Sequence, residues 1–336
     1  MAGATPDERN RCVDFLRAAS ILAVILGHWI MAAPQVVDGS IRPGHMLDLA
    51  RWTQGLTWIF QVMPVFFLVG GYSNAVSWAS AGRRGTPYAA WLAGRLQRLV
   101  GPLLVLLTAW AILGAGAWLY GARPTLVKIS SQMALIPVWF LSVYVVVALL
   151  VPWTCSLWRR MGWGSVAMFV ACAVAMDALF FHAPALRWVT WSNYLFVWLA
   201  VHQVGHAWQA GRLPSFPARV AIGVASGALL VWAVSAGPWP MSMVGVPGDP
   251  VSNTQPPKVT LLLLAGMQAG LLLGLEGPIR RWLHGSIAWT ATVLVNGMIM
   301  TVYLWHLTVM TLVVGVVWAA GSWGLRLDPG TGAWWW

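Results

Sequence analysis

Long apolar blocks, separated by short polar and basic segments, recur along this chain. Most blocks are about 20 residues long, the length that a helix needs to cross a hydrocarbon core of about 30 Å. They do not show the single apolar stripe of a soluble helix, and they are too long and uniform for barrel strands. Backbone groups in lipid must be hydrogen-bonded within each segment, so we expect each block to be a transmembrane helix.

The predicted spans cover 15–34, 56–79, 99–120, 134–155, 163–182, 189–210, 218–236 and 259–276. The last apolar stretch, 286–321, is too long for one span, and we expect two short helices broken near Asn296 and Gly297. The pattern therefore predicts an all-α fold, a polytopic transmembrane bundle of about ten helices. We expect one transmembrane domain over 1–325 without an appended domain. A short tail over 326–336 follows, and its closing tryptophans suit the membrane interface.

Composition agrees with this membrane assignment. Hydrophobic residues make up 59% of the 336 and charged residues 9%, whereas soluble domains average about 25% charged. The net charge of +11 comes from short basic clusters between apolar blocks, so we expect no nucleic-acid partner. Residues 1–34 resemble a signal peptide, but the run is long and further spans follow, so we expect it to be retained.

The basic residues also predict the orientation of the chain. With the N-terminus in the cytoplasm, thirteen arginines fall on the cytoplasmic side and six basic residues fall outside. The cytoplasmic set is Arg9, Arg11, Arg17, Arg83, Arg84, Arg95, Arg98, Arg159, Arg160, Arg212, Arg219, Arg280 and Arg281; the outer set is Arg42, Arg51, Arg123, Lys128, Arg187 and Lys258. We therefore expect a multi-pass protein of the cell membrane with its N-terminus inside. The Pro- and Gly-rich segment 237–258 is then an outer loop.

Two ionisable residues, Arg17 and His28, stand eleven residues apart in the first apolar block. On a helix this spacing places them on one face, roughly 16 Å apart. Ionisable side chains in a membrane helix are costly and indicate a functional site. Asp14, three residues before Arg17, either orients its guanidinium or caps the helix, and we favour the first role. Taken singly, Arg17 also fits a membrane anchor and His28 a contact between helices.

The segment around this pair resembles a known family. RCVDFLRAASILAVILGHW, at 11–29, is similar to the first helix of the acyltransferase family 3 membrane proteins, whose signature is an Arg, ten residues and a His. Further matches follow in order. They are MPVFFLVGGYSN at 63–74, GRLQRLVGPLL at 94–104, VWFLSVY at 138–144 and VYLWHLTV at 302–309.

The resemblance implies transfer of an acyl group, most commonly acetyl, from cytoplasmic acyl-CoA to a hydroxyl of an extracytoplasmic acceptor. The acceptor would be a glycan, a glycolipid or a small molecule. Arg17, Arg95 and Arg98 would bind the CoA phosphates, since guanidinium groups pair with phosphate in a bidentate manner. His28 would be the general base, because its pKa lies near neutrality. Direct transfer and an acyl-histidine intermediate both fit the sequence.

Other residues are candidates for the acceptor site. His306 either orients the base or the acceptor or forms a hydrogen bond between helices, and Tyr303 lies one turn before it. Trp139 and Asn74 are further candidates for acceptor binding. His202 and His206 have the spacing of metal ligands but no evident third ligand, so we expect no metal and only acyl-CoA as cosubstrate.

A secondary transporter or flippase is the alternative function, because intramembrane Arg and His also suit a proton-coupled carrier. Such carriers usually contain repeated halves with matching broken helices, and the sequence shows no such symmetry. A purely structural membrane scaffold is a third interpretation, but it leaves the shared face of Arg17 and His28 unexplained.

Overall fold

The computed structural model describes residues 9–335. The longer helices are α1 (Arg11–Met31), α4 (Met63–Arg83), α5 (Tyr88–Leu119), α6 (Pro124–Ala134), α7 (Val138–Leu149), α8 (Val151–Met161), α9 (Trp163–His182), α10 (Asn193–Gln209), α11 (Phe216–Ala236), α12 (Val259–Gly274), α13 (Glu276–Trp282) and α14 (Ser286–Ala319). The short ones are α2 (Met46–Leu49), α3 (Thr57–Phe60) and α15 (Gly332–Trp335), with 3-10 turns η2 (Arg51–Leu56), η3 (Pro184–Leu186) and η4 (Val189–Ser192). Strands β1 (Gln35–Val37) and β2 (Ser40–Arg42) form one antiparallel hairpin, with Val36 opposite Ile41.

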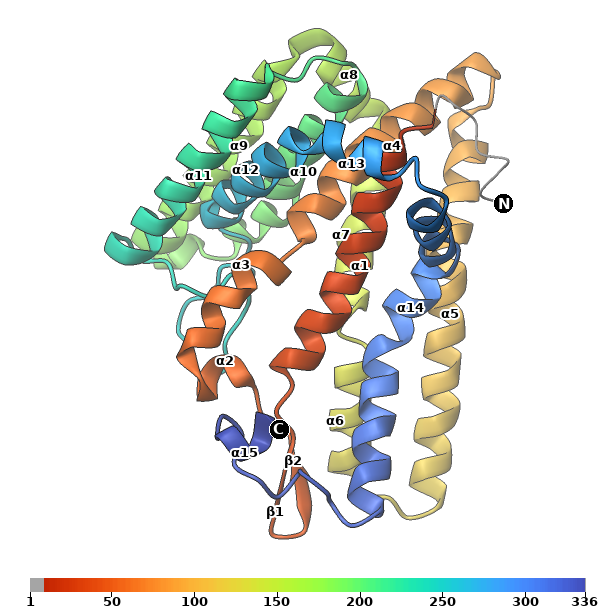
Figure 1. Cartoon of the computed structure of the whole chain (residues 1–336), viewed down its shortest axis with the longest axis vertical. Coiled ribbons are helices and arrows are strands. Elements are labelled where there is room, and N and C mark those ends of the chain that lie inside the picture. Colours follow the sequence, from red (N-terminus) through yellow and green to blue (C-terminus); the bar gives the residue numbers. More distant parts are fainter. Residues whose placement is uncertain (1–8, 336) are drawn as a thin grey trace.

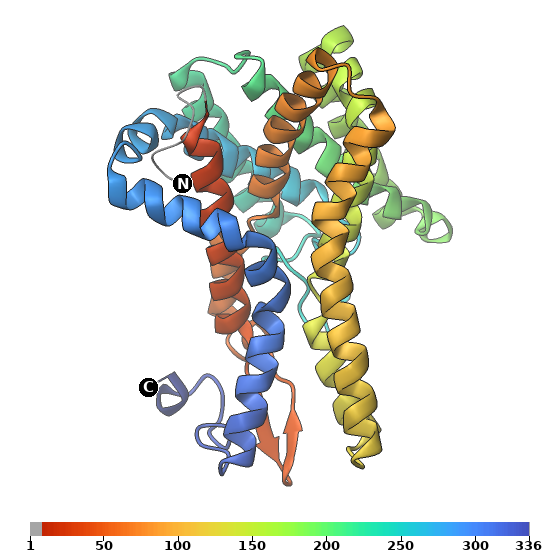
Figure 2. The same ribbon diagram turned by 90° about the vertical axis from the view of Figure 1, so that its right-hand side faces the viewer.

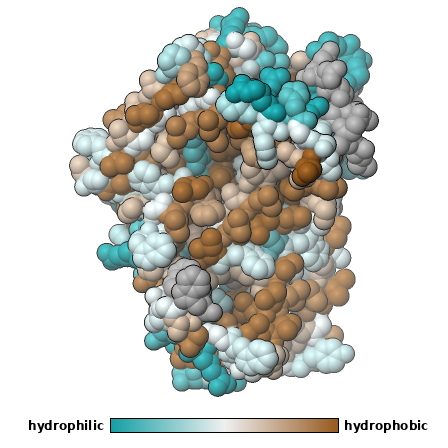
Figure 3. Space-filling view, viewed as in Figure 1, coloured by the Kyte–Doolittle hydropathy of each residue, from teal (hydrophilic) through white to brown (hydrophobic). Residues whose placement is uncertain are grey.

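The prediction of an all-α membrane bundle is confirmed, with the small hairpin as its only sheet among residues 9–335. Within that range seven helical segments are long and apolar enough to cross a membrane. The count becomes eight if α12 and α13, which are bent by 51° relative to each other, form one span. Figure 3 shows hydrophobic residues over most of one face, with hydrophilic groups toward its upper and lower margins. The chain is an integral, multi-pass membrane protein.

The predicted break in the last apolar stretch is wrong. α14 is one continuous helix of 34 residues, although Figure 2 shows that it bends between its ends. The side chain of Asn296 explains why this polar residue does not end the helix. Its Nδ2 donates to the Thr292 carbonyl at 2.9 Å and to the Asp14 carbonyl of α1 at 2.8 Å. The predicted span 134–155 is instead interrupted, because α7 ends at Leu149 and α8 begins at Val151.

The helix α1 lies between α4 and α14, and this position organises the site (Figure 1). The chain enters α1 beside α13 and leaves it into the β1–β2 hairpin. We call these two ends of the bundle the Arg17 end and the hairpin end. The loop 237–258 contains no helix or strand, as predicted, and it is anchored by Asn253, whose Nδ2 donates to the carbonyls of Pro240 and Ser242 at 2.8 Å each.

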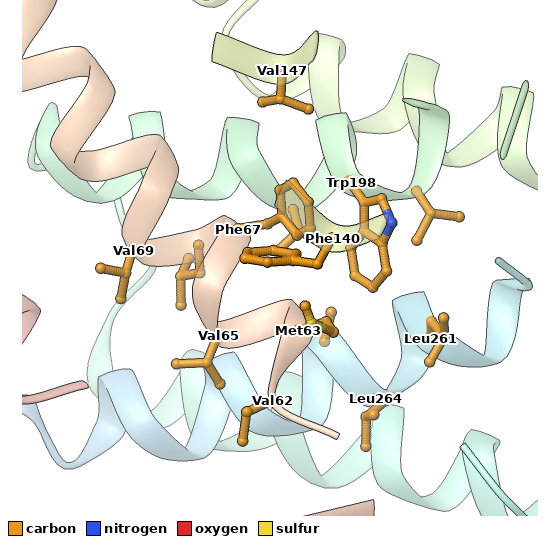
Figure 4. Packing of buried hydrophobic residues seen from close by; sticks show 14 of the residues in the cluster. Val62, Met63, Val65, Phe67, Val69, Phe140, Val147, Trp198, Leu261 and Leu264 are labelled. Carbon is orange, nitrogen blue, oxygen red and sulfur yellow. The ribbon is translucent and has the colours of Figure 1, made fainter. Parts of the chain in front are cut away.

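The core centres on α4, which is packed closely against α10. Phe67 of α4 stacks on Trp198 of α10, with ring centroids 4.7 Å apart, and Phe140 meets Phe67 edge-on at 5.6 Å (Figure 4). Further along the same contact, one glycine on each helix allows the backbones of α4 and α10 to approach closely. A Cβ on Gly205 would lie 2.2 Å from the Leu68 carbonyl oxygen, so only glycine permits this approach. Because α4 is packed so closely against α10, its backbone is held in place, and so are the positions of its polar residues.

Candidate active site

A group of cations lies at the Arg17 end, where α1 meets α4. The buried carboxylate of Asp14 accepts hydrogen bonds from Arg9 Nε at 2.6 Å and from Arg17 Nη1 at 3.3 Å. Arg17 Nη2 donates to Ser73 Oγ of α4 at 2.6 Å. The guanidinium of Arg17 is therefore held on two sides, by a carboxylate of its own helix and by a hydroxyl of the neighbouring helix.

A third guanidinium, from α5, reaches the same part of α4. Arg95 Nη2 donates to Asn74 Oδ1 and, at 3.4 Å, to the carbonyl of Ser73. The Arg95 guanidinium also lies 5.3 Å from the centre of the Trp91 ring. The group thus contains three guanidinium groups, those of Arg9, Arg17 and Arg95, and one carboxylate, that of Asp14, which leaves excess positive charge. Such a group attracts a polyanionic ligand.

A pair of histidines lies toward the hairpin end, where α1 meets α14. The rings of His28 and His306 are 5.1 Å apart and inclined at 64°. His28 Nδ1 is 2.8 Å from the Val24 carbonyl, and His306 Nδ1 is 2.6 Å from the Tyr303 carbonyl. A carbonyl only accepts, so both Nδ1 atoms carry hydrogen, and in the neutral imidazole each Nε2 atom then keeps a lone pair. The His306 Nε2 is buried without a partner among residues 9–335.

These two clusters share the helix α1. Arg17 and His28 are separated by eleven residues, so the clusters lie roughly 16 Å apart along one face of a single rigid element. One end offers excess positive charge and the other offers two imidazole lone pairs. This is the arrangement expected where an anionic donor and a group to be deprotonated are held by the same helix.

The acyltransferase 3 family model, an acyltransferase domain, matches residues 10–336. The chain belongs to acyltransferase family 3. No curated protein and no solved structure matches it. The family resemblance of the motifs is confirmed, and the chain is a membrane-bound O-acyltransferase.

The other residues predicted for this acyltransferase's site lie in different places. Asn74 is fully buried at the Arg17 end, between Arg95 and His202, whose Nε2 is 3.1 Å from Asn74 Nδ2. Tyr303 is at the histidine pair, but its hydroxyl donates to the Pro137 carbonyl at 2.9 Å. Trp139 is 38% exposed. Asn74 is therefore separated from Tyr303 and belongs with the cations.

Arg98 is the remaining predicted site residue, and His206 belongs to the histidine pair with metal-ligand spacing. Arg98 lies three residues after Arg95 and is exposed. His206, in the acyltransferase's core, has its Nδ1 3.0 Å from the Gly71 carbonyl and its Nε2 3.3 Å from Thr154 Oγ1. Across residues 9–335 no group of three or more His, Cys, Asp or Glu side chains could hold a metal ion.

Ser73 and His45, which lie beside the two clusters, were not among the predicted site residues. The Ser73 hydroxyl accepts a hydrogen bond from Arg17, and the Ser73 carbonyl accepts one from Arg95. In the sequence, Ser73 is one more polar residue in a predicted span. His45 precedes α2 and forms a backbone bridge with Ala32, one turn beyond His28. Burial, and then the nearby His28, lower the pKa of His45, whose Nδ1 is buried without a partner in the described chain. The β1–β2 hairpin returns the chain to the end of α1 and so places His45 near His28. The hydrophobic pattern of the sequence does not predict this contact.

Proposed function

We propose that this acyltransferase moves an acyl group from acyl-CoA in the cytoplasm to a hydroxyl of an extracytoplasmic glycan, glycolipid or small molecule. One observation carries the proposal. The helix α1 presents a cationic cluster at one end of a face and a histidine with a free Nε2 at the other.

The donor is assigned to the Arg17 end. Acyl-CoA carries several phosphates, and the guanidinium groups of Arg17 and Arg95 are suited to bind them. Asp14 and Ser73 hold Arg17, so the donor meets a group that is already oriented. The excess of basic residues on the N-terminal side of the membrane supports a cytoplasmic position for this end. The exposed Arg98, three residues after Arg95, adds positive charge at this end.

The chemistry is assigned to the histidine pair. His28 Nε2 takes the proton of the acceptor hydroxyl as the oxygen attacks the thioester carbonyl. The C–S bond then breaks, the departing CoA sulfur takes the proton from the imidazolium, and an ester and free CoA result. The Nδ1 hydrogen bond to Val24 keeps His28 in the tautomer that this step needs. An acyl-histidine intermediate, formed by attack of Nε2 on the thioester, fits the same geometry.

The test replaces the base and measures acyl incorporation. We expect His28→Gln to abolish the transfer of radioactive acyl groups from acyl-CoA to the glycans and lipids of cells, at normal protein abundance. His284→Gln, a change at an exposed histidine, should leave incorporation unchanged. Normal incorporation by His28→Gln would contradict the mechanism. Purified protein that neither binds nor consumes acyl-CoA would favour the carrier function instead.

A further inference from the structure

An apolar cavity of about 280 Å³ lies between the β1–β2 hairpin, α6 and α14. Its wall begins one helical turn beyond each histidine of the pair. Ala32, the residue directly after α1, follows His28 by four residues, and Met310 follows His306 by four residues on α14. The cavity therefore lies beyond the histidine pair on the side of the hairpin end, away from Arg17.

The lining of this cavity selects for hydrocarbon. Leu126 and Met133 line it from α6, Val314 and Gly315 line it from α14, and no charged side chain is among its lining residues. One of its two hydroxyl groups, that of Thr311, already donates to the Leu307 carbonyl at 2.8 Å. A sugar or a phosphate would lose its hydrogen bonds to water here without replacement, whereas an alkyl chain would gain by burial.

We propose that this cavity binds the hydrocarbon chain of the donor's acyl group, so that acyl-CoA with a chain of six carbons or more is preferred over acetyl-CoA. The proposal rests on the proposed function. A thioester carbonyl carries the CoA sulfur on one side and the acyl chain on the other. With CoA at Arg17 and the carbonyl at His28, the chain leaves in the direction of Ala32 and Met310.

The geometry also sets where the effect of chain length begins. The chain must pass about one helical turn, roughly 5.4 Å or about four carbon–carbon bonds, before it enters the cavity. Short acyl groups therefore end before the cavity. Beyond that length, each further methylene that enters should strengthen binding by about fourfold, until the cavity is full.

Gly315 offers a substitution that fills the cavity. A Cβ built on Gly315 meets no heavy atom within 4 Å, so Gly315→Leu places its side chain in open space without displacing the backbone. Gly297 gives a matched control on the same helix. It is exposed, a Cβ there also meets nothing within 4 Å, and it does not line the cavity.

The experiment measures the dissociation constants of unreactive S-alkyl-CoA thioethers with ethyl, butyl, hexyl, octyl and decyl chains. The full-length protein is held in nanodiscs, and empty nanodiscs give the partition background. We expect ethyl and butyl to bind alike and octyl to bind at least tenfold more tightly. Gly315→Leu should keep the ethyl affinity and lose the octyl gain, while Gly297→Leu should follow the unchanged protein.

Equal affinity along the series would overturn the inference and leave a membrane lipid or the acceptor as the occupant. Loss of the octyl gain in both Gly315→Leu and Gly297→Leu would also overturn the inference, because filling the cavity would then not be the cause of the loss. If the ethyl thioether and CoA itself both fail to bind, the donor assignment of the proposed function fails as well. The two failures are therefore distinguishable.

Discussion

Asp14→Asn tests whether the Arg17 guanidinium is positioned for the donor. The substitution keeps the size of the side chain and removes the charge that faces Arg9 and Arg17 at 2.6 and 3.3 Å. We expect the KM for acyl-CoA to rise while kcat changes little. In the proposed mechanism the reacting carbonyl lies at His28, fourteen residues or roughly 21 Å along the helix from Asp14.

The size of the effect follows from the burial of the pair. The Asp14 side chain is 7% exposed and that of Arg17 is 30% exposed. A hydrogen bond to a charged group contributes about 1.5–3 kcal/mol, and the partial exposure of Arg17 places this one near the lower value. A loss of about 1.5 kcal/mol corresponds to roughly a tenfold rise in KM.

Steady-state kinetics with varied acyl-CoA measures this change, and a melting curve checks that the variant folds. Asp38→Asn is the matched control. It removes a carboxylate from another Asp–Arg pair, at 3.4 Å from Arg42, but one in which Asp38 is 85% exposed. A donor KM that is the same in Asp14→Asn and in the unchanged protein would refute the positioning role, as would an equal rise in the control.

Three further predictions concern other parts of the chain. Burial lowers the pKa of Lys258 to about 8 in the folded protein, whereas the pKa of an unfolded lysine is about 10.4. The melting temperature should therefore rise with pH between these two values, and Lys258→Met should remove this rise. Gly205→Ala should lower the melting temperature by several degrees or prevent accumulation, because the new Cβ meets the Leu68 carbonyl, whereas Gly82→Ala has open space and should be tolerated. His306→Gln should lower kcat about tenfold or more at unchanged donor KM, measured by the same kinetics.

The helices could be predicted where lipid alone determines them. The predicted span 163–182 is α9, and 218–236 agrees with α11 to within two residues at its start, because each apolar block must close its own hydrogen bonds. The predicted helix boundaries are wrong where a polar side chain hydrogen-bonds to backbone carbonyls. Asn296 satisfies carbonyls of its own helix and of α1, so a residue that reads as a break lies inside α14.

The candidate site could be predicted only in part. Arg17, His28 and Asp14 share one helix, so their relation follows from spacing. The pairing of His28 with His306 joins residues 278 apart in sequence, and the sequence left two roles open for His306. Ser73 and His45 depend entirely on tertiary contacts, between α4 and α1 for the first and through the hairpin for the second.

In the proposed mechanism one helix, α1, connects a CoA site with a catalytic histidine across the membrane. The most direct measurement uses vesicles in which the protein has one orientation. Radioactive acyl-CoA is supplied only on the side of the N-terminus, and the acceptor fraction of the producing cells only on the other side. We expect labelled acceptor on the far side with the unchanged protein and none with His28→Gln. Equal labelling by both proteins, or labelling only when donor and acceptor share one side, would contradict it.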